Sequence, residues 1–102
     1  MKYQLVLQWP AASIDDYDTM ISVEDSLIKG LSDDDEVDGH DAGSGQVNIF
    51  ILTDHPVRVF EDIEKILKDC GAWSDVRAAY REVEKSIYTT LWPRDLREFK
   101  IL

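Results

Sequence analysis

The segment from Gln46 to Thr53 constrains the fold more than any other part of the sequence. Its apolar residues fall on both faces of an extended chain: Val47, Ile49 and Ile51 on one, Phe50 and Leu52 on the other. Successive side chains of a strand point to opposite faces, so a strand with this pattern has to be covered on both. Helices usually cover only one face of a small α+β sheet. A homodimer partner or the C-terminal tail is therefore expected on the second face.

Periodicity along the rest of the chain predicts two amphipathic helices and four more strands. The helices are expected at about Ile14–Lys29 and from Asp54 to about Cys70. The further strands are expected at Lys2–Trp9, Val37–Asp41, Val76–Val83 and Ile87–Trp92. The first helix is expected to bury Tyr17, Met20, Ile21, Leu27, Ile28 and Leu31, and the second Val59, Phe60, Ile63, Ile66, Leu67 and Cys70.

The ends of these elements carry turn and capping residues. Ser13 and Asp16 form a weak capping box before the first helix, and Asp54 is the expected cap of the second. Gly30 and Gly71 follow the helices at positions typical of a C-terminal cap. After Pro93, the tail holds Leu96, Phe99, Ile101 and Leu102, which is enough apolar surface to dock on the body.

The resulting order is β-α-β-β-α-β with an added strand and tail, in one α+β domain spanning residues 1–102. Two helices separated by a hairpin pack naturally on one face of an antiparallel sheet. We therefore predict a ferredoxin-like fold with both helices on one face and an extra C-terminal strand and tail.

Charge limits the partners. The chain has 11 Lys and Arg against 21 Asp and Glu, a formal charge of −10. Such a surface repels phosphate backbones and anionic membranes, so neither nucleic acid nor membrane is expected as a partner. A single cysteine and an N-terminus without an apolar leader favour the cytoplasm. No cofactor is expected, and the charge permits cationic proteins, metal ions or neutral ligands as partners, of which we favour a basic protein.

Several short runs resemble a group of small uncharacterised bacterial proteins. They are Val37-Asp38-Gly39-His40-Asp41-Ala42-Gly43-Ser44-Gly45, Asn48-Ile49-Phe50-Ile51, Ala79-Tyr80-Arg81 and Leu91-Trp92-Pro93. The resemblance spans most of the chain. It implies the same α+β fold and a bacterial origin, and it implies no activity and no catalytic residue.

The segment from Asp33 to Gly45 is the most unusual part of the sequence. It combines six carboxylates with His40 and three glycines. It does not match a calcium loop, because Gly45 stands where a bidentate Glu is needed. Asp38, His40 and Asp41 are the candidate ligands of a divalent ion. The simpler interpretation is a solvated acidic loop whose glycines serve a hairpin or bulge rather than a phosphate.

Other reactive residues lack the partners that catalysis needs. Ser44 lies in no nucleophile elbow, and Asp38 is the better placed of the two possible partners of His40. Cys70 is expected in the core of the second helix. Tyr80 and Tyr88 are expected to line the uncovered face of the sheet.

Two functions remain. The first is a non-enzymatic protein-binding domain of inhibitor, immunity or regulatory type, in which Asp34, Asp35, Glu36, Asp38 and Trp92 contact a basic partner. Trp92 is included because an indole at a strand end combines a large contact area with one donor. The second is a small metal-binding protein or metal-dependent enzyme that uses Asp38, His40 and Asp41.

Overall fold

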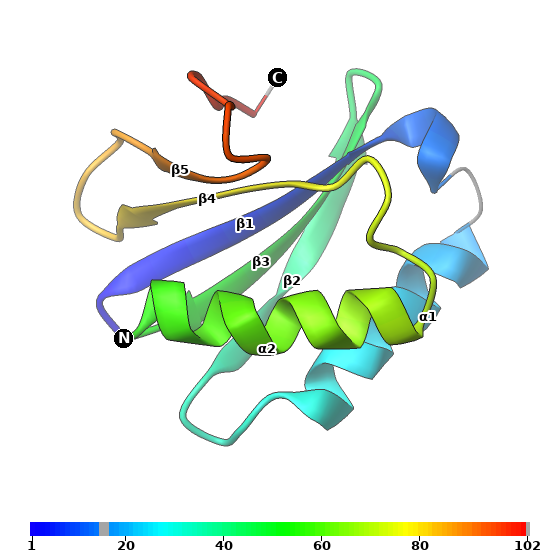
Figure 1. Cartoon of the computed structure of the whole chain (residues 1–102), viewed down its shortest axis with the longest axis horizontal. Helices are drawn as coiled ribbons and strands as arrows, with labels where there is room; N and C mark the ends of the chain where they lie inside the picture. Colours follow the sequence, from blue (N-terminus) through cyan, green and yellow to red (C-terminus); the bar gives the residue numbers. More distant parts are fainter. Residues whose placement is uncertain (15–16, 102) are drawn as a thin grey trace.

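The computed structural model describes residues 1–14 and 17–101 of the chain. They form a five-stranded antiparallel sheet with two α-helices on one face (Figure 1). The strands are β1 (Tyr3–Pro10), β2 (Glu36–Gly43), β3 (Gln46–Thr53), β4 (Arg77–Glu82) and β5 (Thr89–Trp92). The helices are α1 (Tyr17–Gly30) and α2 (Pro56–Asp69), and a 3₁₀ turn, η1, covers Ala11–Ser13. No helix in the described part of the chain is long and apolar enough to cross a membrane.

The strand order β2-β3-β1-β4-β5 confirms the predicted ferredoxin-like fold. The first four strands have the order of that fold, and β5 is the predicted extra strand, paired with β4 alone. β2 forms the opposite edge and pairs with β3 alone. The two edges are therefore separated by three strands, which decides below which residues can share a binding surface.

The main core lies between the sheet and the helices. β1 contributes Leu5, Leu7 and Trp9, and β3 contributes Ile49 and Ile51, all at most 1% exposed. They pack against Leu27 of α1 and Ile63 and Leu67 of α2. Trp9 also donates its indole N–H to the carbonyl of Ala72, at 2.8 Å. The alternating pattern predicted from the sequence thus places β1 and β3 at the centre of the sheet.

The C-terminal tail covers part of the second face. A smaller cluster there unites Val6, Ala79 and Phe99, with Phe50, Tyr88, Leu96 and Ile101 packed around it. The rings of Tyr88 and Phe99 lie 5.0 Å apart. Of the two expected coverings of this face, the tail is the one that the fold places there. Leu102 lies outside the described residues.

The hairpin between β2 and β3 uses its glycines as predicted. Ser44 and Gly45 both have positive φ (52° and 79°), as the two central residues of a type I′ turn require. Between Val37 and Gly39 the register shifts, so Asp38 is the extra residue of a β-bulge. Gly39 adopts φ 119°, a conformation that side chains with a Cβ rarely take.

Several local predictions were wrong. Tyr17 and Ile28 are 66% and 57% exposed, because only a narrower stripe of α1, with Met20, Val23 and Leu27, faces the core. Cys70 is also exposed, since it follows the last turn of α2 rather than lying on its buried face.

The predicted helix caps also differ. The capping position of α2 is His55, without a side-chain cap, while the Asp54 carboxylate accepts the backbone N–H of Lys2. Asp16, the second member of the predicted capping box, lies outside the described residues.

Candidate functional site

The acidic loop leads into the outer strand of the sheet. Asp33, Asp34, Glu36 and Asp38, which we call the acidic edge, are all exposed around the start of β2. No Lys or Arg in the described part of the chain forms an ion pair with any of these four carboxylates. Four carboxylates without a cation are therefore gathered where the sheet has an unpaired strand edge.

Asp35 differs from its neighbours because it is tied to the fold. Its Oδ1 atom accepts a hydrogen bond of 2.6 Å from the hydroxyl of Thr53, which is fully buried at the end of β3. The same hydroxyl accepts the backbone N–H of His55 at the start of α2, at 3.0 Å. Asp35 thus joins the loop to β3 and α2, and its contribution is structural.

The three candidate metal ligands do not face one another. His40 lies opposite Ile49 on the helix side, where its Nδ1 is 3.0 Å from Glu24 of α1. Asp41 lies opposite Asn48 on the other side and accepts a hydrogen bond from it at 2.9 Å. Asp38 is exposed at the bulge, which breaks the alternation that would have placed it beside His40. Among residues 1–14 and 17–101, no three His, Cys, Asp or Glu side chains are grouped closely enough to hold a metal ion.

Charge is divided unequally between the two halves of the molecule. Residues 1–53 hold two Lys or Arg and eleven Asp or Glu, a formal charge of −9, and form β1, α1, β2 and β3. Residues 54–102 hold nine Lys or Arg and ten Asp or Glu, a formal charge of −1, and form α2, β4, β5 and the tail. Because β2, β3 and β1 are neighbours in the sheet, the acidic half in sequence is also one side of the molecule.

The single described Lys–carboxylate pair of the acidic half lies on α1. Asp25 is 2.9 Å from Lys29, and the hydrogen bond that the Lys29 ammonium donates to the Asp25 carboxylate raises the pKa of that lysine above its usual value. The two residues are exposed and lie one helical turn apart on α1, so Lys29 neutralises none of the four carboxylates of the acidic edge.

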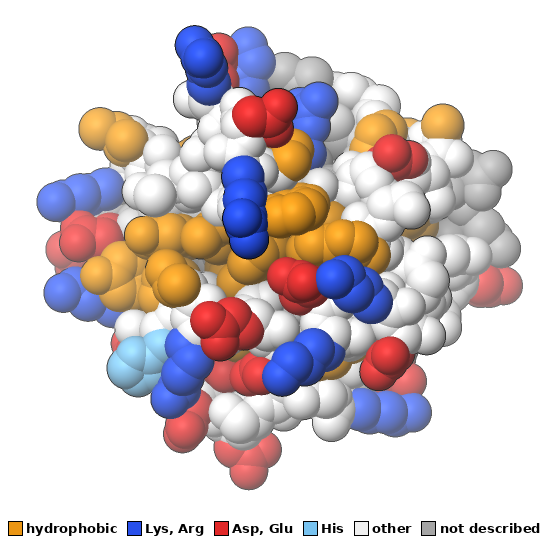
Figure 2. Space-filling view, viewed as in Figure 1, with side chains coloured by type: hydrophobic (Ala, Val, Ile, Leu, Met, Phe, Trp, Pro, Cys, Tyr) orange, Lys and Arg blue, Asp and Glu red, His pale blue; other side chains and the backbone are white. Residues whose placement is uncertain are grey.

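Trp92 lies far from the acidic edge, because β5 and β2 are opposite edges of the sheet. The predicted partner-binding residues therefore form two separate surfaces. Trp92 belongs to a row of apolar side chains between α2 and the β4–β5 strands, which we call the aromatic band and which consists of Tyr3, Val57, Phe60, Trp73, Tyr80 and Trp92. Figure 2 shows apolar side chains running across this face, with charged groups of both signs along the sides.

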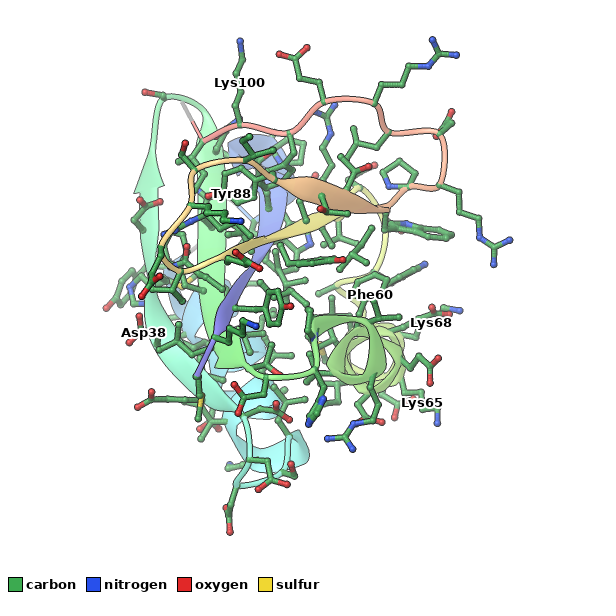
Figure 3. The ribbon with its side chains drawn as sticks, turned by 90° about the vertical axis from the view of Figure 1, so that its left-hand side faces the viewer. Asp38, Phe60, Lys65, Lys68, Tyr88 and Lys100 are labelled. Atoms are coloured by element: carbon green, nitrogen blue, oxygen red, sulfur yellow. The ribbon has the colours of Figure 1, made fainter. Side chains whose placement is uncertain are left out.

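Ring contacts join the aromatic members of the band in two groups. The ring centroids of Trp73 and Trp92 are 5.1 Å apart and those of Phe60 and Trp73 are 5.9 Å apart. Tyr3 and Tyr80 meet edge to face at 5.8 Å, beside a cavity of about 500 Å³ at the start of α2. Phe60 projects from α2 toward the sheet, whereas Tyr88 lies on the far side of it (Figure 3). Tyr80 and Tyr88 are thus on opposite faces, and the prediction that both line the uncovered face was wrong.

The band was missed from the sequence for a physical reason. Phe60 was expected in the core, and Tyr3 on the apolar face of the first strand. The prediction for Phe60 is confirmed, since Phe60 is 9% exposed and belongs to the main core. Tyr3 is half-buried beside Tyr80, at the end of the same apolar face of β1. Only the sheet order shows that the border of the core is open here, because α2 packs against β1 while β4 and β5 extend past it.

A second cavity, also about 500 Å³, lies at the other end of the molecule between η1, α1 and the β2–β3 turn, and its lining is mostly apolar. Small residues leave it open: Ala11, Ala12, Ala42, Gly43 and Gly45. Among the described residues that line it, Tyr17 alone carries a group that could act as an acid, base or nucleophile, and Tyr17 is 66% exposed.

Comparison with known protein families, with curated proteins and with solved structures found no match. The resemblance to small bacterial proteins therefore stays a prediction. The geometry of the site has to support any function by itself.

Proposed function

We propose that this chain is a non-enzymatic protein-binding domain whose acidic half binds a basic protein. One observation carries the proposal: residues 1–53 have a formal charge of −9, and the described carboxylates among them lie on α1, on β2 and in the loop between these two elements. Among the described residues, no Lys or Arg forms an ion pair with the four carboxylates of the acidic edge. Clustered carboxylates attract a positively charged surface and orient it. In the contact, the attraction of the cations offsets the solvation free energy that the carboxylates lose.

The shape of the acidic edge suits a folded basic partner rather than an added strand. The bulge at Asp38 and the acidic side chains of β2 disturb regular pairing, which is how edge strands avoid joining other sheets. Contact would then be made by the carboxylates themselves. An inhibitor or immunity protein works in this way when it covers a basic active site that normally holds phosphate.

The alternative, a metal-binding protein or metal-dependent enzyme using Asp38, His40 and Asp41, has weaker support. His40 already contacts Glu24, and Asp41 points to the other side of the sheet and contacts Asn48. Reaching a common ion would require breaking both contacts.

The test uses three immobilised proteins. They are the natural chain, a variant with Asp34→Asn, Glu36→Gln and Asp38→Asn, and a control variant with Glu82→Gln, Glu84→Gln and Glu98→Gln. Both variants lose three negative charges, but the control loses them from the half with a charge of −1. Proteins captured from the source cells would be identified, purified and titrated against each variant by calorimetry.

We expect a basic protein that binds the natural chain and the control equally and the acidic-edge variant at least about tenfold more weakly. An equal loss of affinity in both variants would mean that the net charge of the chain, and not the acidic edge, determines binding. The absence of any purified partner that binds directly, or equal binding to all three proteins, would contradict the proposal.

A further inference from the structure

The aromatic band is an apolar surface of the half with little net charge, and all its members except Phe60 are at least partly exposed. Trp73, Tyr80 and Trp92 are partly exposed although their rings stack or meet, and Val57 at the end of the band is 56% exposed. Continuous apolar surface bordered by polar groups is typical of a protein–protein contact. What covers this surface can be inferred from the charge around it.

Charges of both signs alternate along the border that α2 forms. Arg58, Lys65 and Lys68 are interspersed with Glu61 and Glu64, and the ammonium of Lys68 lies 2.7 Å from Glu64 and 5.3 Å from the centre of the Trp73 ring. Lys65 and Lys68 project from the outer side of α2, whereas Phe60 projects toward the sheet (Figure 3). A surface with both signs and a net charge near zero can face an identical surface without repulsion.

We infer that the aromatic band is covered by a second copy of this chain, in a two-fold symmetric dimer. The acidic half disfavours self-association, because the acidic halves of two copies would repel each other. The second face of the sheet is occupied in part by the tail of the same chain. The band is the place where apolar surface and balanced charge coincide, and a two-fold contact sets the same patch of each copy against the other.

Pairing between the β5 strands of two copies would explain a dimer less well than contact between their aromatic bands. β5 has four residues, its register against β4 shifts between Ala78 and Ala79, and Pro93 follows it directly. Short, irregular edges that end in proline rarely extend a sheet. The dimer would therefore be held by side chains, with the rings of Trp73 and Trp92 at its centre, as large aromatic residues usually are.

The dimer has a consequence for the position of the acidic edges. β5 lies near the contact and β2 at the opposite edge of the sheet, so each copy would present its acidic edge away from the other. The inference does not depend on the proposed function, but the two together would give an assembly with two outward acidic surfaces.

The test is the mass in solution, measured by sedimentation over concentrations up to about 100 µM, where a dimer of ordinary interface size is populated. The natural chain is compared with Trp92→Ala, with Val57→Glu and with the control Ile28→Ala. Ile28 is as exposed as Val57 but lies on α1 in the acidic half. Circular dichroism verifies the fold of each variant, and Val57→Glu retains the test if Trp92→Ala does not fold.

We expect twice the 11.7 kDa of one chain for the natural protein and for Ile28→Ala. The folded band variants should dissociate at least about tenfold more readily. Raising the salt should leave the dimer unchanged or strengthen it, because repulsion between the acidic halves is screened. A monomeric natural chain would overturn the inference, as would a dimer that the band variants leave intact or one that salt dissociates.

Discussion

The side-chain amide of Gln8 on β1 donates a hydrogen bond of 3.1 Å to the backbone carbonyl of Lys100, 92 residues later in the chain. The same amide also reaches Gln46 and the buried side chain of Asn48, which in turn donates to Asp41. This polar group lies beside the cluster formed by Val6, Ala79 and Phe99. Together they explain how a tail without regular structure covers the second face of the sheet.

Removal of the Phe99 ring should therefore destabilise the whole domain. Phe99 is 8% exposed, and a buried Phe→Ala substitution costs about 3 kcal/mol of unfolding free energy. We expect this loss for Phe99→Ala in urea unfolding, against at most about 0.5 kcal/mol for the exposed neighbour Arg97→Ala. Equal stability of the two variants would show that the tail is not docked.

The two glycines of β2 provide a matched pair for the bulge. Gly39 has φ 119°, whereas Gly43 has no positive φ, and neither would bring an added Cβ within 4 Å of another atom. Neither added Cβ would therefore meet a steric clash, and the positive φ of Gly39 is the difference that the comparison tests. We expect Gly39→Ala to lose about 1–2 kcal/mol in urea unfolding and Gly43→Ala to change stability by less than about 0.5 kcal/mol. Similar values for both would mean that the bulge relaxes without cost.

Much of the fold could be predicted because it depends on local patterns. The bounds of Gln46–Thr53 are those of β3, since alternation and flanking turn residues lie within the segment itself. For the helix predicted from Ile14, the expected buried face was too wide. It included Tyr17 and Ile28, which lie next to the apolar face without facing the sheet. Pattern alone does not show how wide a stripe the neighbouring layer covers.

The candidate site was harder to predict because it depends on the sheet order. Asp34 and Trp92 were assigned to one partner surface, yet they lie on opposite sides of the molecule. The pairing of Asp38 with His40 assumed regular alternation, which the bulge interrupts. The capping of α2 by Asp54 failed for a similar reason, since the backbone N–H of Lys2 on a distant segment binds that carboxylate.

Thr53 should be sensitive to the loss of its hydroxyl. It is fully buried, donates to Asp35 and accepts the backbone N–H of His55. Thr53→Val keeps the shape but leaves that N–H without an acceptor, so we expect a loss of about 1–2 kcal/mol. The exposed Thr89→Val on β5 should change stability by less than about 0.5 kcal/mol in the same urea titration. Equal effects would indicate that Asp35 and His55 find other partners.

Divalent ions should not stabilise the folded chain. His40 and Asp41 point to opposite sides of the sheet, so we expect Mg²⁺, Ca²⁺, Mn²⁺ and Zn²⁺ to give the melting temperature found with EDTA. His40→Ala loses the contact with Glu24 and should cost at most about 1 kcal/mol, with or without the ions. A rise of several degrees with one ion, abolished by His40→Ala, would instead establish the metal site.

Salt should weaken binding of the basic partner by screening the acidic edge. Its four carboxylates are exposed, and charges at the surface interact over a Debye length that falls from about 30 Å at 0.01 M salt to about 3 Å at 1 M. We expect the dissociation constant of the partner to rise at least about tenfold as the salt increases from 0.05 to about 0.5 M, mostly through slower association. Calorimetry gives the constant and stopped-flow fluorescence the rate. The variant with Asp34→Asn, Glu36→Gln and Asp38→Asn should show a clearly smaller dependence on salt, whereas Trp92→Ala should keep the dependence of the natural chain. An affinity that salt leaves unchanged would mean that the acidic half does not form the contact, and would contradict the proposed function.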